Sequence, residues 1–323
     1  MNSQEIAGWV EGVHHGEPCD LDGVATLESA GARELAFSME DAETGAGCVL
    51  VREAVEGRCC IVVADPKLAF IQVLGRVFPE KHPTGIHPTA VIDGQLGQGV
   101  SVGARAVVAE GAVLEEGVVL YPGVYIGRDC HVGAGSVLFP HVVLYEGTVV
   151  GKMCRIHAGS VLGSDGFSAH PGPEGPVKVP QVGRVVLEDG VEIGANCCVD
   201  RAFLEETRIG TGSHLDNLVH IGHNSQLGAN CLLAAQVGIS GSVKLGDGVV
   251  AGGQAGVADH CNVGPGANLA ARAGVISDLE GHQSYLGFPA LPANQGRRAL
   301  ILWKDLPDIW KELQSLRRKV EEG

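Results

Sequence analysis

The stretch LDNLVHIGHN, residues 215–224, gathers side chains that are suited to acid–base chemistry. His220 and His223 carry imidazoles, which take up and return protons near neutral pH. Asp216 is the nearest carboxylate in the sequence and is a candidate for fixing the tautomer of His223. A further histidine, His260, follows in VADHCNVG. These residue types suit removal of a proton from an amine or hydroxyl nucleophile.

An internal repeat decides which way these side chains point. From Leu96 to Val275, aliphatic residues recur at every sixth position with two interruptions, and a glycine often follows the aliphatic residue. Neither a helix nor an ordinary strand has this period. It is the hexapeptide signature of a parallel β-helix, in which three short strands make one coil of about 18 residues. The pattern predicts a mainly β prism of about nine coils around an aliphatic axis.

The cysteines fit this axis. The residue two places before each aliphatic one also points inward, and five of the ten cysteines occupy such positions. No CxxC spacing is present, and adjacent pairs such as Cys59 and Cys60 do not suit zinc knuckles or separate ligands. We therefore interpret these five as small core residues. They are Cys130, Cys154, Cys197, Cys231 and Cys261.

The same periodicity places the polar residues outside the axis. Ile221 points inward, so His220 and His223 lie on the outer surface, and residues 18 apart stack in successive coils. Gly241 then lies above His223 and offers a backbone N–H for a developing oxyanion, with His260 in the next coil. This column suits attack of an amine or hydroxyl on a thioester. A polar interface patch explains the same residues equally well.

Two interruptions break the repeat, between Leu162 and Leu187 and between Val199 and Ile209. Insertions in a solenoid leave as loops on one face, often the binding face. Surface decoration is the alternative interpretation, and the sequence does not separate the two.

The flanking segments have other patterns. Residues 1–84 alternate short apolar runs with helix-like stretches, which predicts a small α/β domain before the β-helix of residues 85–280. Residues 281–323 form a C-terminal helical segment, in which Pro307 should break or kink the helix and leave two helices. Residues 296–323 carry a net charge of +2 on an otherwise acidic chain. This end is either a dock for an acidic partner or a solvated helix face.

The composition narrows the function. The net charge of −15 argues against a nucleic-acid binder, because neutralising phosphates needs a basic face. The first residues lack the basic and apolar regions of a signal peptide, and no apolar run is long enough to span a membrane. We expect a cytoplasmic protein without a membrane span.

The chain resembles the UDP-3-O-acylglucosamine N-acyltransferases of lipid A biosynthesis. The resemblance rests on GSDGF, VPQVGRVVLEDGVEIGANCCVDRA, LDNLVHIGHN and GFPALP within the hexapeptide prism. It implies a left-handed parallel β-helix and a homotrimer with sites between neighbouring prisms. It also implies transfer of a 3-hydroxyacyl chain from acyl carrier protein to the 2-amine of a UDP-3-O-(3-hydroxyacyl)glucosamine. No bound cofactor or metal is expected beyond the phosphopantetheine of the carrier.

The resemblance also implies roles for individual residues. His223 matches the general base, His260 the second functional histidine and Asp216 the aspartate paired with the base, while the column above adds Gly241. We expect further residues of the same stretch to bind substrate, namely Asn217, His220 and Asn224.

Phe37 is kept from the family pattern, but three other positions depart from it. Phe37 is the candidate to stack on uracil, but Glu40 and Glu43 stand where the family has Asn and Tyr, so core packing is the favoured role of Phe37. Gly274 aligns with a Met that limits the acyl groove in some members. A glycine there predicts a longer groove and a longer acyl chain.

Three other functions remain open at this point. A zinc-dependent β-helix carbonic anhydrase would need His220, His223 and His260 as ligands, although the first two diverge from one turn. A related hexapeptide acyltransferase would act on a different aminosugar. A non-catalytic paralogue would only bind a sugar nucleotide.

Overall fold

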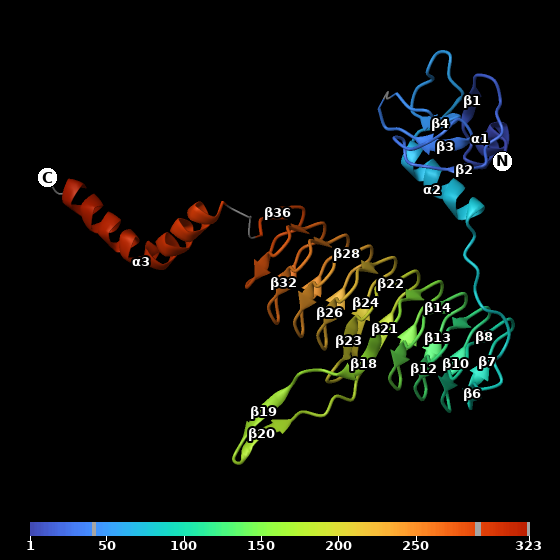
Figure 1. The fold of residues 1–323 in the computed structure, drawn as a ribbon. Coiled ribbons are helices and arrows are strands. Elements are labelled where there is room, and N and C mark those ends of the chain that lie inside the picture. The colour runs from blue at the N-terminus through green and yellow to red at the C-terminus, as the bar shows by residue number, and fades with distance from the viewer. Residues whose placement is uncertain (41–42, 288–291, 322–323) are drawn as a thin grey trace. The chain divides into compact units, whose positions relative to one another are not determined.

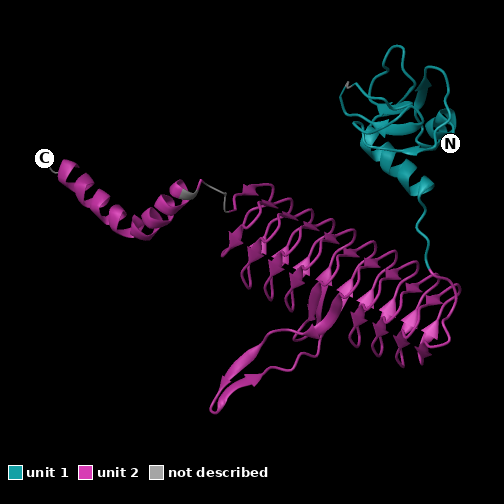
Figure 2. Ribbon diagram, in the orientation of Figure 1, with its two compact units in different colours: residues 1–82 teal, residues 83–323 magenta. Residues whose placement is uncertain are grey.

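The computed structural model describes residues 1–40, 43–287 and 292–321. The chain divides into two compact units, Met1–His82 and Pro83–Gly323 (Figure 2). The three-part division at residues 84 and 280 stays a prediction.

The N-terminal unit is a five-stranded sheet with two helices. Its strand order is β1-β5-β4-β3-β2, and only the β1–β5 pair is antiparallel. Asp65 caps the second helix by accepting the Leu68 N–H, with Pro66 in the first turn. The elements are α1 (Ser3–Trp9), β1 (Val13–His15), β2 (Gly23–Val24), β3 (Glu34–Phe37), β4 (Cys48–Val51), β5 (Cys60–Val62) and α2 (Pro66–Val77).

The second unit contains a prism of three parallel sheets, which we name by their first strands (Figure 1). The β6 face contains β6 (Val91–Ile92), β9 (Val107–Val108), β12 (Tyr125–Ile126), β15 (Val143–Leu144), β18 (Val161–Asp165), β23 (Cys198–Arg201), β26 (His220–Ile221), β29 (Gly238–Ile239), β32 (Gly256–Val257) and β35 (Gly274–Val275). The β7 face contains β7 (Gln95–Leu96), β10 (Val113–Leu114), β13 (His131–Val132), β16 (Val149–Val150), β21 (Arg184–Leu187), β24 (Glu206–Ile209), β27 (Gln226–Leu227), β30 (Lys244–Leu245) and β33 (Asn262–Val263). The β8 face contains β8 (Ser101–Val102), β11 (Val119–Leu120), β14 (Val137–Leu138), β17 (Arg155–Ile156), β22 (Glu192–Ile193), β25 (His214–Leu215), β28 (Leu232–Leu233), β31 (Val250–Ala251), β34 (Asn268–Leu269) and β36 (Ser284–Tyr285).

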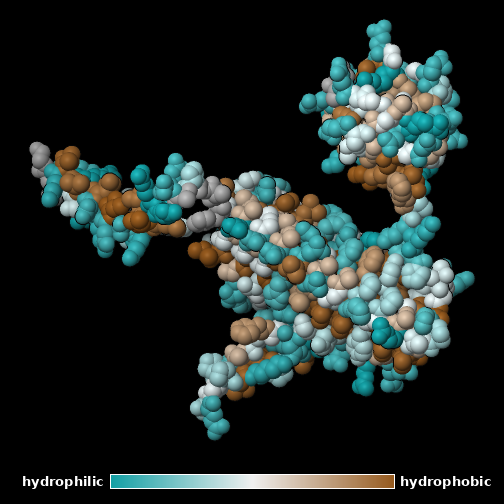
Figure 3. All heavy atoms as spheres, in the orientation of Figure 1, coloured by the Kyte–Doolittle hydropathy of each residue, from teal (hydrophilic) through white to brown (hydrophobic). Residues whose placement is uncertain are grey.

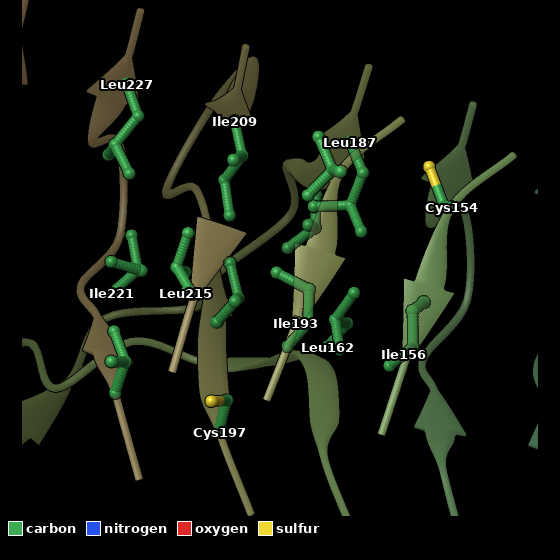
Figure 4. Packing of buried hydrophobic residues seen from close by; sticks show 14 of the residues in the cluster. Cys154, Ile156, Leu162, Leu187, Ile193, Cys197, Ile209, Leu215, Ile221 and Leu227 are labelled. Atoms are coloured by element: carbon green, nitrogen blue, oxygen red, sulfur yellow. The ribbon is translucent and has the colours of Figure 1, made fainter. Parts of the chain in front are cut away.

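The axis of the prism is the aliphatic column that the repeat predicts, so the β-helix fold is confirmed. Ile221 pairs in register with Ile239, and both are fully buried. The five cysteines of the repeat are buried as predicted, and Figure 4 shows Cys154 and Cys197 packed among the aliphatic side chains. Burying such a continuous column is the main stabilising contribution in a fold with so few aromatic residues.

The prism is longer than the predicted nine coils. Strand β6 precedes the repeat and β36 follows it, while bridges of Ile86 and Leu279 extend the β8 and β7 faces. These end rungs are missed because their aliphatic residues are out of phase. Ile92 lies only four positions before Leu96, and β36 ends in a tyrosine.

The two insertions leave the prism differently. The first forms an antiparallel hairpin of β19 (Ala169–Gly172) and β20 (Gly175–Lys178), which projects from the β-helix in Figure 1. The second is a short loop between β23 and β24. Buried Arg201 ties both together, because its Nε donates to the Gly163 carbonyl at 2.8 Å and its Nη2 to the Glu146 carbonyl at 2.8 Å.

The C-terminal segment is one helix, α3 (Ala293–Glu321), with Pro307 inside it. The expectation of two separate helices is therefore wrong, while Figure 1 shows the bend that a proline without an N–H donor produces. Apolar side chains are exposed along α3 (Figure 3), including Leu306, Ile309 and Leu313. Residues 288–291 of the GFPALP motif lie outside the described residues.

Candidate active site

A cleft of about 640 Å³ on the β6 face brings together four of the predicted residues, His220, His223, Gly241 and His260. Phe167 of the first insertion also lines it. The column arises as the repeat predicts, since β26 and β29 pair in register and the turns after them stack. The Gly241 carbonyl accepts the His260 N–H at 3.1 Å, which joins the upper two coils of the column.

The imidazole of His223 is held on several sides. Its Nδ1 lies 3.1 Å from the Asn224 Oδ1. A side chain at Gly166 would collide with the His223 Cβ, Cγ and Cδ2 within 2.9 Å, so the first insertion packs closely against this histidine. A Cβ at Gly241 would lie 2.7 Å from the His223 Nε2. Glycine at position 241 therefore keeps this ring nitrogen open to the cleft.

Asp200 is a residue of the cleft that the sequence analysis missed. It is only 7 % exposed, accepts the Ser164 hydroxyl at 3.0 Å, and its Oδ2 lies 3.6 Å from the His220 Nε2. Burial raises the pKa of this carboxyl group above its usual range, and the His220 imidazole and the Ser164 hydroxyl oppose that rise. The signal was available: Asp200 directly follows Val199, the residue that pairs with Ile221.

Asp216 and Asn217 lie in a different place. They line a second pocket, of about 570 Å³, on the β8 face together with His157, Glu192 and His214. The Asp216 Oδ1 accepts the Asn217 N–H at 2.7 Å, and the Asn217 Oδ1 accepts the Ala195 N–H at 2.7 Å. A single chain therefore does not bring Asp216 into the cleft of His223.

Gly274 ends a column of outward-facing glycines on the β6 face. His220, Gly238, Gly256 and Gly274 pair in register on successive strands. A Cβ at any of the three glycines would meet no atom within 4 Å. The surface beyond His220 is thus an open strip without side chains, which runs along the prism from the cleft toward its C-terminal coils.

The described residues contain no group of three His, Cys, Asp or Glu side chains placed to bind a metal ion. None of the helices in the described ranges is long and apolar enough to cross a membrane.

Comparisons with known proteins identify the repeat and the family. Residues 106–140 match the bacterial transferase hexapeptide family (six repeats), and residues 218–258 match the hexapeptide repeat of succinyl-transferase. The chain is 41 % identical to UDP-3-O-acylglucosamine N-acyltransferase 1 of Gloeobacter violaceus, over 100 % of this chain and 96 % of that protein. It is 46 % identical to the UDP-3-O-acylglucosamine N-acyltransferase of Syntrophotalea carbinolica, over 94 % and 91 % of the two chains.

The chain belongs to the UDP-3-O-acylglucosamine N-acyltransferase family. It is an acyltransferase of the hexapeptide class, as the sequence motifs indicate. A solved structure with a related prism is the UDP-N-acetylglucosamine O-acyltransferase of Moraxella catarrhalis. Its TM-score is 0.49 at 24 % identity, with 62 % of this chain and 71 % of that chain covered.

The N-terminal unit departs from the pocket expected for this N-acyltransferase family. Phe37 is half-buried, and its ring centroid lies 5.0 Å from that of Phe70 on α2, so Phe37 packs in the core of its own domain. A separate hollow of about 410 Å³ in the same unit, which Phe37 does not line, is lined by Glu40, Arg52 and Glu53 among others. Carboxylates at such a place repel a nucleotide diphosphate.

Proposed function

We propose that this chain transfers a 3-hydroxyacyl group from acyl carrier protein to the 2-amine of UDP-3-O-(3-hydroxyacyl)glucosamine, with His223 as the general base. One observation carries the proposal. His223 lines a cleft with two further imidazoles, and the glycine at position 241 leaves free the space over its ring that any side chain would fill.

The reaction balances with these groups. As the amine nitrogen attacks the thioester carbonyl, the His223 Nε2 takes up the proton of the amine. The oxyanion that forms is stabilised by the Gly241 N–H, with His260 on the same wall. Collapse of the tetrahedral intermediate breaks the C–S bond, and the departing phosphopantetheine thiolate takes up the proton from the imidazolium. The protein itself needs no bound cofactor in this scheme.

The two pockets support a homotrimer with shared sites. The cleft of His223 and the pocket of Asp216 lie on different faces of the same coils, so only a neighbouring copy can bring Asp216 opposite His223. In a closed ring of copies, the β6 face of each prism would meet the β8 face of the next. Leu232 and Val250 are exposed around the Asp216 pocket, as expected of a surface that a partner covers.

Helix α3 carries an independent sign of self-association. Its exposed apolar residues are spaced alternately four and three apart, as in a coiled coil, and two exposed tryptophans widen this stripe. Leucine and isoleucine predominate at these positions. Two-stranded coiled coils instead typically alternate β-branched residues with leucine. The stripe comprises Leu302, Leu306, Ile309, Leu313, Leu316 and Val320, flanked by Trp303 and Trp310.

The basic residues of α3 suit an acidic acyl carrier protein. Arg297, Arg298 and Lys304 are exposed, as is the Arg317–Lys319 cluster near the end of the helix. The partner would bind through these side chains, with an affinity that falls as the salt concentration rises.

The function is tested by measuring acyl transfer from 3-hydroxyacyl carrier proteins of several chain lengths to UDP-3-O-acylglucosamine. The wild type should transfer the chain and His223→Ala should not. His131→Ala is the matched control, because His131 lies on the β7 face and bonds to Glu115. A folded wild type that is inert with every donor, or active only on another aminosugar, would contradict the proposal.

A further inference from the structure

The second insertion reaches His223 through the side chain of Asn224. Asn224 sits in the turn after β26 with φ of 61°, a left-handed conformation that asparagine tolerates better than most residues. Its Oδ1 accepts the Phe203 N–H at 2.9 Å, and its Nδ2 donates to the Leu204 carbonyl at 3.0 Å. The insertion is therefore fastened to the residue next to the base.

These two backbone bonds fix the orientation of the amide. A rotated amide would turn its NH₂ group against the Phe203 N–H and its oxygen against the Leu204 carbonyl, so both bonds would be lost. The atom that faces the His223 Nδ1 at 3.1 Å is thus the oxygen, which can only accept. The Nδ1 must then carry the proton, and the Nε2 keeps the free lone pair.

That lone pair lies on the correct nitrogen. Gly241 lies over the Nε2 end of the ring, since a Cβ there would meet Nε2, Cε1 and Cδ2 at 2.7, 2.8 and 3.1 Å, and both residues line the cleft in which an incoming amine must deliver its proton. The turn itself is held, because the Asn224 N–H donates to the Oγ1 of fully buried Thr207 at 2.9 Å. The opposite side of the imidazole is packed against Gly166.

We infer that Asn224 is a positioning residue that fixes the Nδ1–H tautomer of His223, and that the second insertion exists to orient this amide. The inference rests on the proposed role of His223 as the base. Asn224 acts on His223 within one chain, whereas Asp216 lies on another face and can meet His223 only from a neighbouring copy. The inference also replaces the expectation that Asn224 binds substrate.

The direct test is nitrogen NMR of the protein with ¹⁵N-labelled histidine, in which His223→Gln identifies the His223 signals. The wild type should show a protonated Nδ1 and an unprotonated Nε2 at pH 8. In Asn224→Ala the Nε2–H form should become the major one. A wild type with a protonated Nε2 would overturn the inference. This readout needs no substrate, so it stands apart from any failure of the proposed reaction.

Kinetics provide the second test. Asn224→Ala should lower kcat at least about tenfold with little change in KM, because proton transfer, not binding, is impaired. Asn224→Asp keeps an acceptor for Nδ1 and should restore most of kcat at high pH. Its added charge favours the imidazolium and raises the pKa of the imidazole, so the acidic limb of the pH profile should move to higher pH.

The matched control is Asn230→Ala. Asn230 has nearly the same backbone conformation, with φ of 56°, in a turn outside the cleft. It should lose as much thermal stability as Asn224→Ala without a change in kcat or in the pH profile. Equal loss of kcat in Asn224→Ala and Asn224→Asp, or an unchanged kcat in both, would reduce Asn224 to a structural residue.

Discussion

The β6 and β8 faces carry similar residue types in the same coils, but their partners differ. On the β8 face, His157 and His214 both contact Glu192, at 3.1 and 3.2 Å. On the β6 face, His223 contacts the neutral amide of Asn224, and a glycine lies over its ring. The comparison teaches that the number of histidines does not identify the base. The accessible nitrogen and the chemistry of its partner do.

The largest expected effect separates the two faces directly. His223→Gln should lower kcat by about 10²- to 10⁴-fold, the usual contribution of a general base. His214→Gln, which removes an imidazole already bound to Glu192, should change kcat much less. The measurement is steady-state acyl transfer by both variants at saturating acceptor. If His214→Gln were as inactive as His223→Gln, the assignment of the base to the β6 face would be contradicted.

Adding a side chain at position 241, next to the imidazole of His223, should have the next largest effect. In Gly241→Ala the new methyl group would lie 2.7 Å from the His223 Nε2, so we expect a loss of kcat of about 10²-fold with the fold intact. Gly253→Ala is the control, since its nearest neighbour would be 3.4 Å away at the Ala235 carbonyl. Full activity of Gly241→Ala would show that the substrate does not approach this nitrogen.

The glycine strip of the β6 face sharpens the comparison further. Gly274→Met should shift the preference toward shorter acyl donors, because the strip beyond His220 offers no other side chain to limit the chain. The measurement is kcat/KM for a series of acyl carrier proteins. No shift toward shorter chains in Gly274→Met would count against the strip as the acyl groove.

The smallest effect concerns stability. The pKa of Asp200 is raised by burial, so its ionised form costs folding free energy at high pH, and this cost disappears as the pH falls through that pKa. Asp200→Asn should therefore unfold at a higher temperature than the wild type at pH 8 and lose this advantage near pH 4. Thermal melts across that range measure it. An advantage that grows at low pH would contradict the assignment.

The sequence predicts whatever follows from the period of 18 residues. It predicts the prism, the buried cysteines and the stacking of Gly241 over His223. The repeat also shows why Asp216 lies away from His223. Leu215 lies one six-residue step before Ile221, and each step moves the chain to another face of the prism.

The contacts made by the insertions could not be predicted in this way. Gly166 and Asn224 take their roles from contacts with backbone that leaves the repeat, where spacing no longer fixes position. The departures Glu40 and Glu43 made core packing the favoured role of Phe37, but its packing on Phe70 depends on α2.

The most direct test of the account is a mixing experiment. His223→Ala and Asp216→Ala proteins are each assayed for acyl transfer alone, then unfolded together, refolded and assayed again. If the two faces of neighbouring copies form one site, each variant alone is strongly impaired, and mixed trimers recover activity at the interfaces that pair an intact His223 with an intact Asp216. Refolded mixed trimers with no more activity than the separate variants would contradict a site shared between the two faces.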